Sequence, residues 1–247
     1  MKAVEVDTLR YRYPDGRLAL DGVSFAIEPG ERIAVLGPNG AGKTTLMLHL
    51  NGILTPESGT IRIAGTNVER RTLPDIRRRV GLVFQDPDDQ LFMPTVWQDV
   101  AFGPHQLGLR GDDLDHVVRA ALHAVGMTDA ADRPPHHLSV GQRRRVAVAT
   151  VLSMQPEVLV LDEPSSNLDP ASRRELAMIL ADLPVTVMMV THDLPYALQV
   201  CARAIVLDDG RVAAEGTISE LLTDDDLLAR HRLELPFGFD RRMLASG

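Results

Sequence analysis

The sequence predicts an α/β fold in which helices cover a mainly parallel β-sheet. Two segments, 158–161 (VLVL) and 185–190 (VTVMMV), are apolar at consecutive positions. Strands of this kind are usually buried on both faces, as in a parallel sheet with helices on each side. The third observation is a glycine-rich loop at 37–42, which lies between a short apolar strand and a helix. This order of elements is typical of α/β domains that bind phosphate groups.

The N-terminal strands are of a different kind. Val4–Arg12 and Leu20–Ile27 alternate between apolar and polar positions and are flanked by Gly, Pro and Asp, which predicts half-exposed strands. With an edge strand at Ile61–Ala64, they are expected to form an antiparallel β subdomain. The core elements expected in this half are a strand at Arg32–Leu36, a helix at Thr44–Leu50 and a strand at Val80–Phe84.

A helical insertion is predicted at about residues 86–135. Prolines, glycines and polar residues there interrupt helical patterns such as Leu114–Val125. The core then resumes with helices at Ser139–Leu152, Pro170–Leu180 and Leu194–Cys201, and with strands at Val158–Leu161, Thr186–Val190, Ala204–Leu207 and Arg211–Ala214. We expect one domain over 1–247, with a peripheral C-terminal tail from about residue 217.

Composition excludes several classes of protein. The chain carries 26 Lys and Arg against 34 Asp and Glu, so its net charge of −8 argues against coating nucleic acid. Cys201 is the single cysteine, so no internal disulfide can form and a reducing compartment is expected. No stretch is apolar over the roughly 18 residues that a spanning helix needs. The charged segment Met1–Tyr13 has no apolar signal core, so we do not expect secretion.

The sharpest motif is GPNGAGKT at 37–44, which fits the pattern G-x-x-x-x-G-K-[ST]. Backbone N–H groups of such a loop surround phosphate, and the helix that follows presents its positive end. A lysine there adds charge at the outer phosphates, and the hydroxyl that follows ligates Mg²⁺. The alternative is a glycine-rich turn that fits by chance. The nucleotide-binding residues expected here are Gly37, Pro38, Asn39, Gly40, Ala41, Gly42, Lys43, Thr44 and Thr45.

The second motif is VLVLDEP at 158–164, an apolar strand that ends in two carboxylates. It would place charge at the carboxyl edge of the sheet, where ligands bind in α/β folds. Asp162 is predicted to hold Mg²⁺ through water, and Glu163 to polarise the attacking water. The alternative is a strand followed by an acidic turn.

The third motif, HLSVGQRRRVAVA at 137–149, resembles the LSGGQ signature of ATP-binding cassette (ABC) ATPases. Ser139 is a natural helix N-cap, and Gly141 has no side chain to block an anion. In that family the signature contacts the ATP held by a partner chain, which implies the same for Ser139, Gly141 and Gln142. Val140 departs from the usual glycine. The alternative is an amphipathic helix with a serine cap and a basic face.

Four further residues match the family in order. Tyr13 matches the aromatic residue that stacks on adenine, with Tyr11 as its rival. Gln85 matches the glutamine that joins the Mg²⁺ and water site to the transport partner. Asp169, in SSNLDP, matches the acidic residue of the loop that crosses the dimer, and His192 the histidine near the terminal phosphate. Taken alone, each residue has a simpler interpretation. Tyr13 could be an aromatic ring on the surface, Gln85 a solvated amide, and His192 a histidine at the end of a strand.

The resemblance implies an ATP-hydrolysing enzyme with ATP and Mg²⁺ as cofactors, acting as a head-to-tail dimer of identical or related chains. The segment 84–109, FQDPDDQLFMPTVWQDVAFGPHQLGL, resembles the energy-coupling-factor branch of ABC importers. Such ATPases work with transmembrane coupling and substrate-binding subunits at the cytoplasmic face of the membrane. Leu91, Phe92 and Trp97 are candidates for a groove that holds a partner's helix. The alternative is that they pack the helical insertion.

The prediction of the transported substrate depends on a further resemblance. The segment 231–239, HRLELPFGF, is similar to that of cobalt and nickel importer ATPases, and a vitamin importer is the alternative. The pairs His136–His137 and His116–His123 lack the spacing of a metal-ligand cluster on this chain. A soluble ABC ATPase that acts on DNA or ribosomes is the alternative of another class. The single cassette and the acidic net charge disfavour that alternative. A third alternative, a phosphate-loop kinase, would leave the signature motif at 137–149 unexplained.

Overall fold

The computed structural model describes residues 1–240 and 242. Its centre is a six-stranded sheet in which neighbouring strands are parallel except at one edge, where two strands are antiparallel. In spatial order the strands are β10 (Arg211–Thr217), β9 (Arg203–Asp208), β3 (Arg32–Leu36), β8 (Thr186–Val190), β7 (Val158–Asp162) and β6 (Val80–Val83). The predicted mainly parallel core is therefore confirmed.

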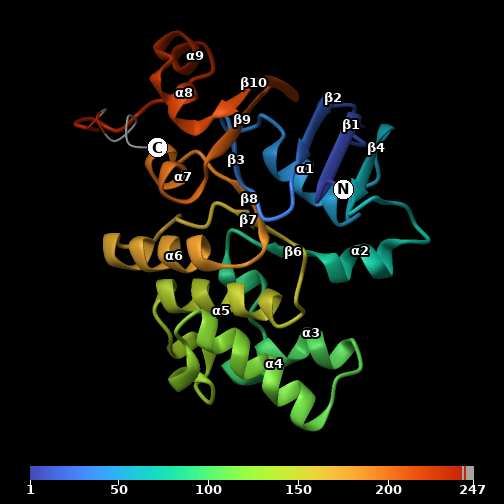
Figure 1. The fold of residues 1–247 in the computed structure, drawn as a ribbon, viewed down its shortest axis with the longest axis vertical. Coiled ribbons are helices and arrows are strands. Elements are labelled where there is room, and N and C mark those ends of the chain that lie inside the picture. Colours follow the sequence, from blue (N-terminus) through green and yellow to red (C-terminus); the bar gives the residue numbers. More distant parts are fainter. Residues whose placement is uncertain (241, 243–247) are drawn as a thin grey trace.

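A second, antiparallel sheet lies beside the first (Figure 1). In spatial order its strands are β2 (Leu18–Ile27), β1 (Val4–Arg12), β4 (Ser58–Ile63) and β5 (Thr66–Asn67). The sequence predicted three of these strands. It missed β5, which is two residues long and carries no pattern of its own.

Successive side chains along the central strands point to opposite faces of the sheet, and each face is covered by its own hydrophobic core. Along β8, Val187 and Met189 face one core, whereas Met188 and Val190 face the other. The second core also contains the antiparallel sheet and the helix α1 (Lys43–Leu50). Because both faces of the central sheet are covered, β3, β7 and β8 are buried along almost their whole length rather than at alternate positions, whereas the edge strand β10 alternates.

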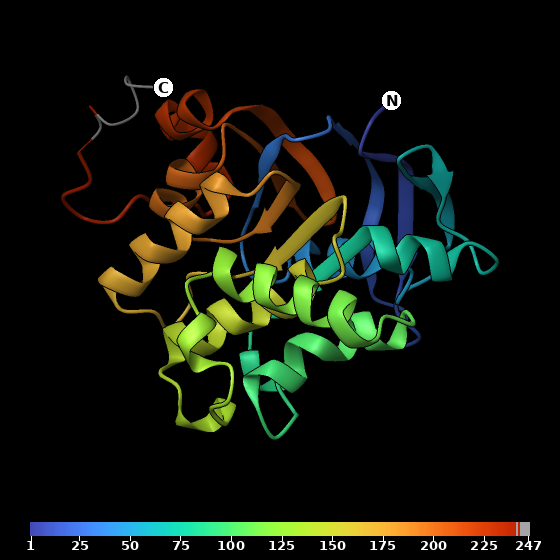
Figure 2. The ribbon, with the colours of Figure 1, turned by 60° about the horizontal axis from the view of Figure 1, so that its bottom comes forward.

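The remaining helices, apart from α2, pack on the other face of the central sheet. They are α3 (Val96–Gln106), α4 (Gly111–Ala124), α5 (Val140–Leu152), α6 (Pro170–Asp182), α7 (Leu194–Val200), α8 (Ile218–Thr223) and α9 (Asp225–Arg230). Single 3₁₀ turns lie at Pro87–Asp89, Thr128–Ala130 and Pro135–His137. Figure 2 shows α3, α4 and α5 together, so the stretch predicted as a helical insertion packs against the signature helix α5.

Helix α3 continues through a proline, which the sequence analysis treated as an interruption. Pro104 has no N–H, so the carbonyl of Val100 loses its helical donor. The Ser153 hydroxyl, just beyond α5, donates to that carbonyl at 2.8 Å. A tertiary hydrogen bond therefore replaces the missing helical one.

The C-terminal stretch differs from the prediction of a peripheral tail. Thr217 and Glu220 form a capping box at the start of α8, and Ile218, Leu221 and Leu222 are buried in the main core. Leu233, beyond α9, is buried there too. The capping-box spacing and the apolar positions at i, i+3 and i+4 explain why this segment folds onto the domain. The parts of the predicted tail at 241 and 243–247 lie outside the described residues.

Helix α2 (Leu73–Arg79) is also absent from the elements predicted from the sequence. This helix is short and buries only Ile76, so it shows no apolar periodicity. Within the described part of the chain, no helix is long and apolar enough to cross a membrane.

Candidate functional site

Four adjacent parallel strands have their carboxyl ends at the same edge of the central sheet, and predicted site residues lie at each end or within two residues of it. The loop 37–42 follows β3, His192 lies just beyond β8, Asp162 ends β7, and Gln85 follows β6. The register pairs Asp162 with Val190 and Val83 with Leu161, so these ends lie at the same level. The topology thus gathers segments that are far apart in the sequence.

The loop 37–42 is shaped by close backbone contacts. Gly37 has φ 150°, and a Cβ on it would lie 2.1 Å from the Leu207 carbonyl oxygen. Gly42 has φ 101°, and its Cβ would lie 2.5 Å from the Ala19 carbonyl oxygen. Only glycine fits at these two positions. Helix α1 begins at Lys43 directly after this loop, so its N-terminal N–H groups face the pocket.

Lys43 lies inside the loop. Its Nζ donates to the carbonyl oxygens of Gly37 at 2.7 Å and Pro38 at 2.9 Å. Burial lowers the pKa of Lys43, and the nearby carboxylates of Glu163 and Asp162 raise it in part. An anion in the loop would provide the full counter-charge that the two carbonyls do not.

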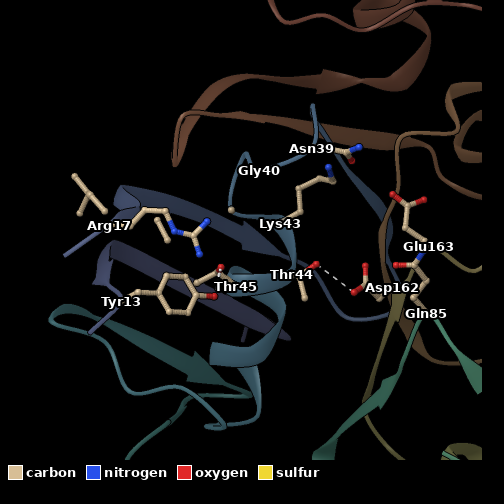
Figure 3. A pocket seen from close by; sticks show the side chains of 13 residues that line it. Tyr13, Arg17, Asn39, Gly40, Lys43, Thr44, Thr45, Gln85, Asp162 and Glu163 are labelled. Atoms are coloured by element: carbon tan, nitrogen blue, oxygen red, sulfur yellow. Dashed lines mark hydrogen bonds between the residues drawn. The ribbon is translucent and has the colours of Figure 1, made fainter. Parts of the chain in front are cut away.

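The pocket at this edge is elongated, with a volume of about 280 Å³. Figure 3 shows Tyr13 and Arg17 at one end, Lys43 in the middle, and Asp162 and Glu163 at the other end. Gln85 lines the same acidic end. The other residues that line it are Leu18, Ala19, Asn39, Gly40, Gly42, Thr44 and Thr45. An aromatic end and a charged end fit a nucleotide, whose base and phosphates differ in the same way.

The acidic end offers oxygen ligands. The Thr44 hydroxyl donates to Asp162 Oδ2 at 3.2 Å, and Gln85 lies beside this pair in the pocket. Burial raises the pKa of Asp162, and the hydrogen bond from Thr44 lowers it in part. A divalent cation here would favour the charged carboxylate, so the donor set of hydroxyl, carboxylate and amide oxygens fits Mg²⁺. In the described part of the chain, no group of three or more His, Cys, Asp or Glu could hold a metal ion.

Glu163 is held tightly by the segment after β8. Its backbone adopts φ 44°, a left-handed conformation that is uncommon outside glycine. The Thr191 hydroxyl donates to Oε2 at 2.9 Å, and the backbone N–H of His192 donates to Oε1 at 3.1 Å. The His192 ring joins through Nδ1, which lies 2.7 Å from Oε1. The Glu163 side chain is 10% exposed, whereas the His192 side chain is 62% exposed.

The structure separates the two tyrosine candidates. Tyr13 lines the pocket, and its hydroxyl lies 2.9 Å from the Thr45 hydroxyl. Tyr11 instead contacts the buried His49 ring edge-on, with 4.6 Å between ring centroids. Arg17 Cζ lies 4.6 Å from the centre of the Tyr13 ring. Tyr13 is therefore the aromatic residue available to a ligand.

Gly37, Pro38, Ala41 and His192 lie beside this pocket without lining it. Four other predicted nucleotide-binding residues lie on helix starts outside it. Ser139 and Gln142 form a capping box at the start of α5, and Gly141 packs so closely that a Cβ would lie 2.4 Å from the Ser172 hydroxyl oxygen. Asp169 caps α6 by accepting from the backbone N–H groups of Ala171 and Ser172. None of the four lines the pocket that holds Lys43. Val140 lines a neighbouring hollow shared with Gln85 and Asp162.

Sequence reasoning missed three residues around the site. Arg17 lines the pocket, but a basic residue in an exposed turn gave no distinct signal. Thr191 lies in a motif whose distinctive residue is His192, so the sequence gives Thr191 no signal of its own. Arg144 was read as part of a basic helix face, yet it is 1% exposed and donates to the Phe84 carbonyl at 2.9 Å. Burial lowers the pKa of Arg144, with Asp86 raising it in part.

Comparisons with known proteins agree with this geometry. A family model described as ABC transporter matches residues 20–166. A Streptomyces coelicolor protein, named as a candidate ABC transporter ATP-binding protein, is 66% identical over 99% of this chain and 95% of its own length. The energy-coupling factor transporter ATP-binding protein EcfA of Carboxydothermus hydrogenoformans is 49% identical over 95% of this chain and 87% of its own length.

Solved structures agree as well. The structure of cbiO1 from Clostridium perfringens, part of the ABC transporter complex cbiONQ, has a TM-score of 0.85 and 39% identity over 95% of this chain and 96% of that one. A dimeric ATP-binding cassette in a post-hydrolysis state with ADP and phosphate has a TM-score of 0.76 and 28% identity over 87% of this chain and 98% of that one. The predicted fold class and family resemblance are confirmed. The chain belongs to the ABC transporter family and is an ATPase subunit of the energy-coupling-factor type.

Proposed function

We propose that ATP is hydrolysed at a site shared between two chains arranged head to tail. The observation that carries this proposal is the position of Ser139, Gly141, Gln142 and Asp169, all outside the pocket of their own chain. In a head-to-tail pair, these residues would close the pocket of the other chain. The similarity to a dimeric cassette with ADP and phosphate supports the arrangement.

Each end of the pocket has a proposed role. Tyr13 stacks on adenine, and the loop 37–42 with Lys43, Thr44 and Thr45 surrounds the phosphates. Thr44, Asp162 and Gln85 hold Mg²⁺, which when bound offsets phosphate charge. Glu163 orients the attacking water and accepts its proton, and His192 contacts the terminal phosphate. The His192 side chain is 62% exposed, so its ring can turn toward a ligand once its contact with Glu163 Oε1 breaks, which supports this role.

The test of the shared site uses two inactive variants of the chain. Lys43→Ala disables the loop of one chain, and Ser139→Arg obstructs the signature of the other. Mixed together, the variants form dimers with one intact site, because a wild-type loop then faces a wild-type signature. We expect each variant alone to be inactive and the mixture to recover part of the turnover. Failure of the mixture to recover would contradict a site shared between copies of this chain.

A groove near α2 and α3 is the proposed docking site for a helix of a transmembrane partner. It has a volume of about 380 Å³ and is lined mainly by apolar side chains. Phe92, which is 64% exposed, and Phe102, 38% exposed, stack edge-on within it at 5.1 Å. The prediction that Leu91 and Trp97 also line the groove is wrong, because Leu91 is buried in the core and Trp97 packs against it.

The proposed task is to energise an importer of cobalt or nickel ions from the cytoplasmic face of the membrane. The similarity to EcfA proteins and to cbiO1 supports an importer of this branch. The resemblance at 231–239 favours a metal cargo over a vitamin. The partners would be transmembrane coupling and substrate-binding subunits, with no nucleic acid.

The experiment is to purify this chain with its membrane subunits and reconstitute them in vesicles. We expect ATP-dependent uptake of Co²⁺ or Ni²⁺ that Glu163→Gln abolishes. Uptake of a vitamin alone would contradict the metal cargo and favour the vitamin alternative. Sedimentation of the chain with ribosomes, without a hydrophobic partner, would contradict the transport role altogether.

A further inference from the structure

Thr191 connects the end of the central sheet to the proposed catalytic carboxylate. It directly follows β8 and has no exposed surface. Its backbone N–H donates to the Val35 carbonyl of β3 at 3.1 Å, so its position is set by the sheet. Its hydroxyl donates to Glu163 Oε2 at 2.9 Å and accepts from the backbone N–H of Asp193 at 3.0 Å.

The hydroxyl of Thr191 is held in this orientation from both sides. Asp193, whose N–H it accepts, is itself fixed by the Ser165 hydroxyl at 2.9 Å and by an ion pair with Arg173. Asp193 also caps α7 by accepting from the backbone N–H of Tyr196 at 3.1 Å. Because Asp193 is fixed and the Thr191 backbone is bonded to β3, the Thr191 hydroxyl is held in its orientation toward Glu163.

The orientation of the Glu163 carboxylate depends on a hydrogen-bond donor that stays in place. In the described part of the chain, this carboxylate has two side-chain partners, Thr191 and His192, and these differ in exposure. His192 is exposed and must leave Glu163 in order to contact a phosphate, as its proposed role requires. Thr191 is buried and stays in place. Without it, only the backbone N–H of His192 would still orient the carboxylate when the His192 ring turns away.

We propose that Thr191 is a positioning residue for ATP hydrolysis, whose hydroxyl holds the Glu163 carboxylate toward the phosphate end of the pocket. The inference rests on the role of Glu163 proposed above. It predicts an effect on turnover and not on nucleotide binding, because Thr191 does not line the pocket. A displacement of a reacting group by about 1 Å can reduce a rate on the order of 100-fold.

The test replaces the hydroxyl while keeping the shape of the side chain. Thr191→Val removes the donor, and Thr191→Ser retains it. Thr186→Val is the matched control, because Thr186 is 3% exposed at the other end of β8, away from Glu163. Its hydroxyl accepts from the backbone N–H of Gly30 at 2.9 Å. ATP turnover, KM and thermal unfolding are measured for all three variants and the wild type.

We expect Thr191→Val to lower kcat by about 10- to 100-fold with KM changed less than about twofold. Thr191→Ser should recover most of the turnover, and Thr186→Val should lose stability but keep kcat. The inference is overturned if Thr191→Val keeps kcat within about twofold, if serine fails to recover it, or if Thr186→Val loses as much.

Glu163→Gln, measured alongside, separates this inference from the proposed function. If Glu163→Gln retains turnover, the role of Glu163 itself is wrong. If Glu163→Gln is inactive while Thr191→Val is fully active, only the inference about Thr191 fails. Adding Thr191→Val to Glu163→Gln should cause no further loss, because the two residues act through one carboxylate.

Discussion

The Ser153 hydroxyl donates to the Val100 carbonyl, whose helical donor is missing because α3 contains Pro104. We expect the loss of this hydrogen bond to lower the free energy of unfolding measurably. Ser153→Ala removes the donor to the Val100 carbonyl, and Pro104 cannot supply another. Ser153 is 3% exposed, so bulk water cannot readily replace its hydroxyl as a donor to the Val100 carbonyl. A buried acceptor left without a partner costs about 1–3 kcal/mol. For a chain of this size, each kcal/mol lowers the melting temperature by about 2–4 °C.

We therefore expect Ser153→Ala to lower the free energy of unfolding by about 1–2 kcal/mol in urea titrations, within the range for a single lost buried hydrogen bond. The effect should depend on Pro104. In a Pro104→Ala chain, residue 104 gains an N–H that can donate to Val100 in the helical pattern. Ser153→Ala should then cost clearly less than it does in the wild type.

A double-mutant cycle measures that dependence directly. A coupling energy near zero, with Ser153→Ala costing the same beside proline and alanine, would refute the reasoning. The result also bears on function, because α3 carries Phe102, which lines the proposed docking groove.

The other predictions concern the pocket and the core beside it. Glu163→Gln should keep ATP affinity and lose at least about 100-fold in turnover, checked by equilibrium binding and phosphate release. Normal turnover in that variant would exclude the proposed role. Lys43→Ala should weaken ATP binding by on the order of tenfold or more, and unchanged affinity would count against the phosphate loop. Burial lowers the pKa of His49, so the folded chain takes up its proton at lower pH than the unfolded chain does. Stability should therefore fall as the pH falls through the unfolded value of about 6.5, by at most about 1.4 kcal/mol per pH unit. His49→Leu should flatten this part of the pH dependence, and an unchanged profile in urea titrations would show that another group is responsible.

Much of the fold was predictable because its strands carry strong local signals. VLVL is apolar at every position and VTVMMV at every position but Thr186, and each is followed by polar site residues. The glycine loop was predictable for a similar reason, since backbone contacts at Gly37 and Gly42 allow no side chain. Elements with weak local signals were missed, such as α2, which buries one residue.

Other features depend on contacts between distant segments, and local patterns do not report them. Leu91 and Phe92 are neighbours in the sequence, yet one is buried in the core and the other lies in the groove. The triple arginine at 143–145 reads as an exposed face, yet Arg144 is buried against the Phe84 carbonyl. The C-terminal helices had a readable capping box, and the prediction of a peripheral tail overlooked it.

The sequence by itself determined which side chains stand at the ends of the buried strands, because each motif is contiguous and its spacing follows from local geometry. Only the tertiary structure decided that β3, β8, β7 and β6 lie side by side, which brings Lys43, Asp162 and Glu163 to one pocket. It also decided that Tyr13 rather than Tyr11 faces that pocket, and that Ser139 does not. Strand order depends on how two cores pack against one sheet. The free energy of that packing comes from contacts between distant segments, so no single segment of the sequence reports it.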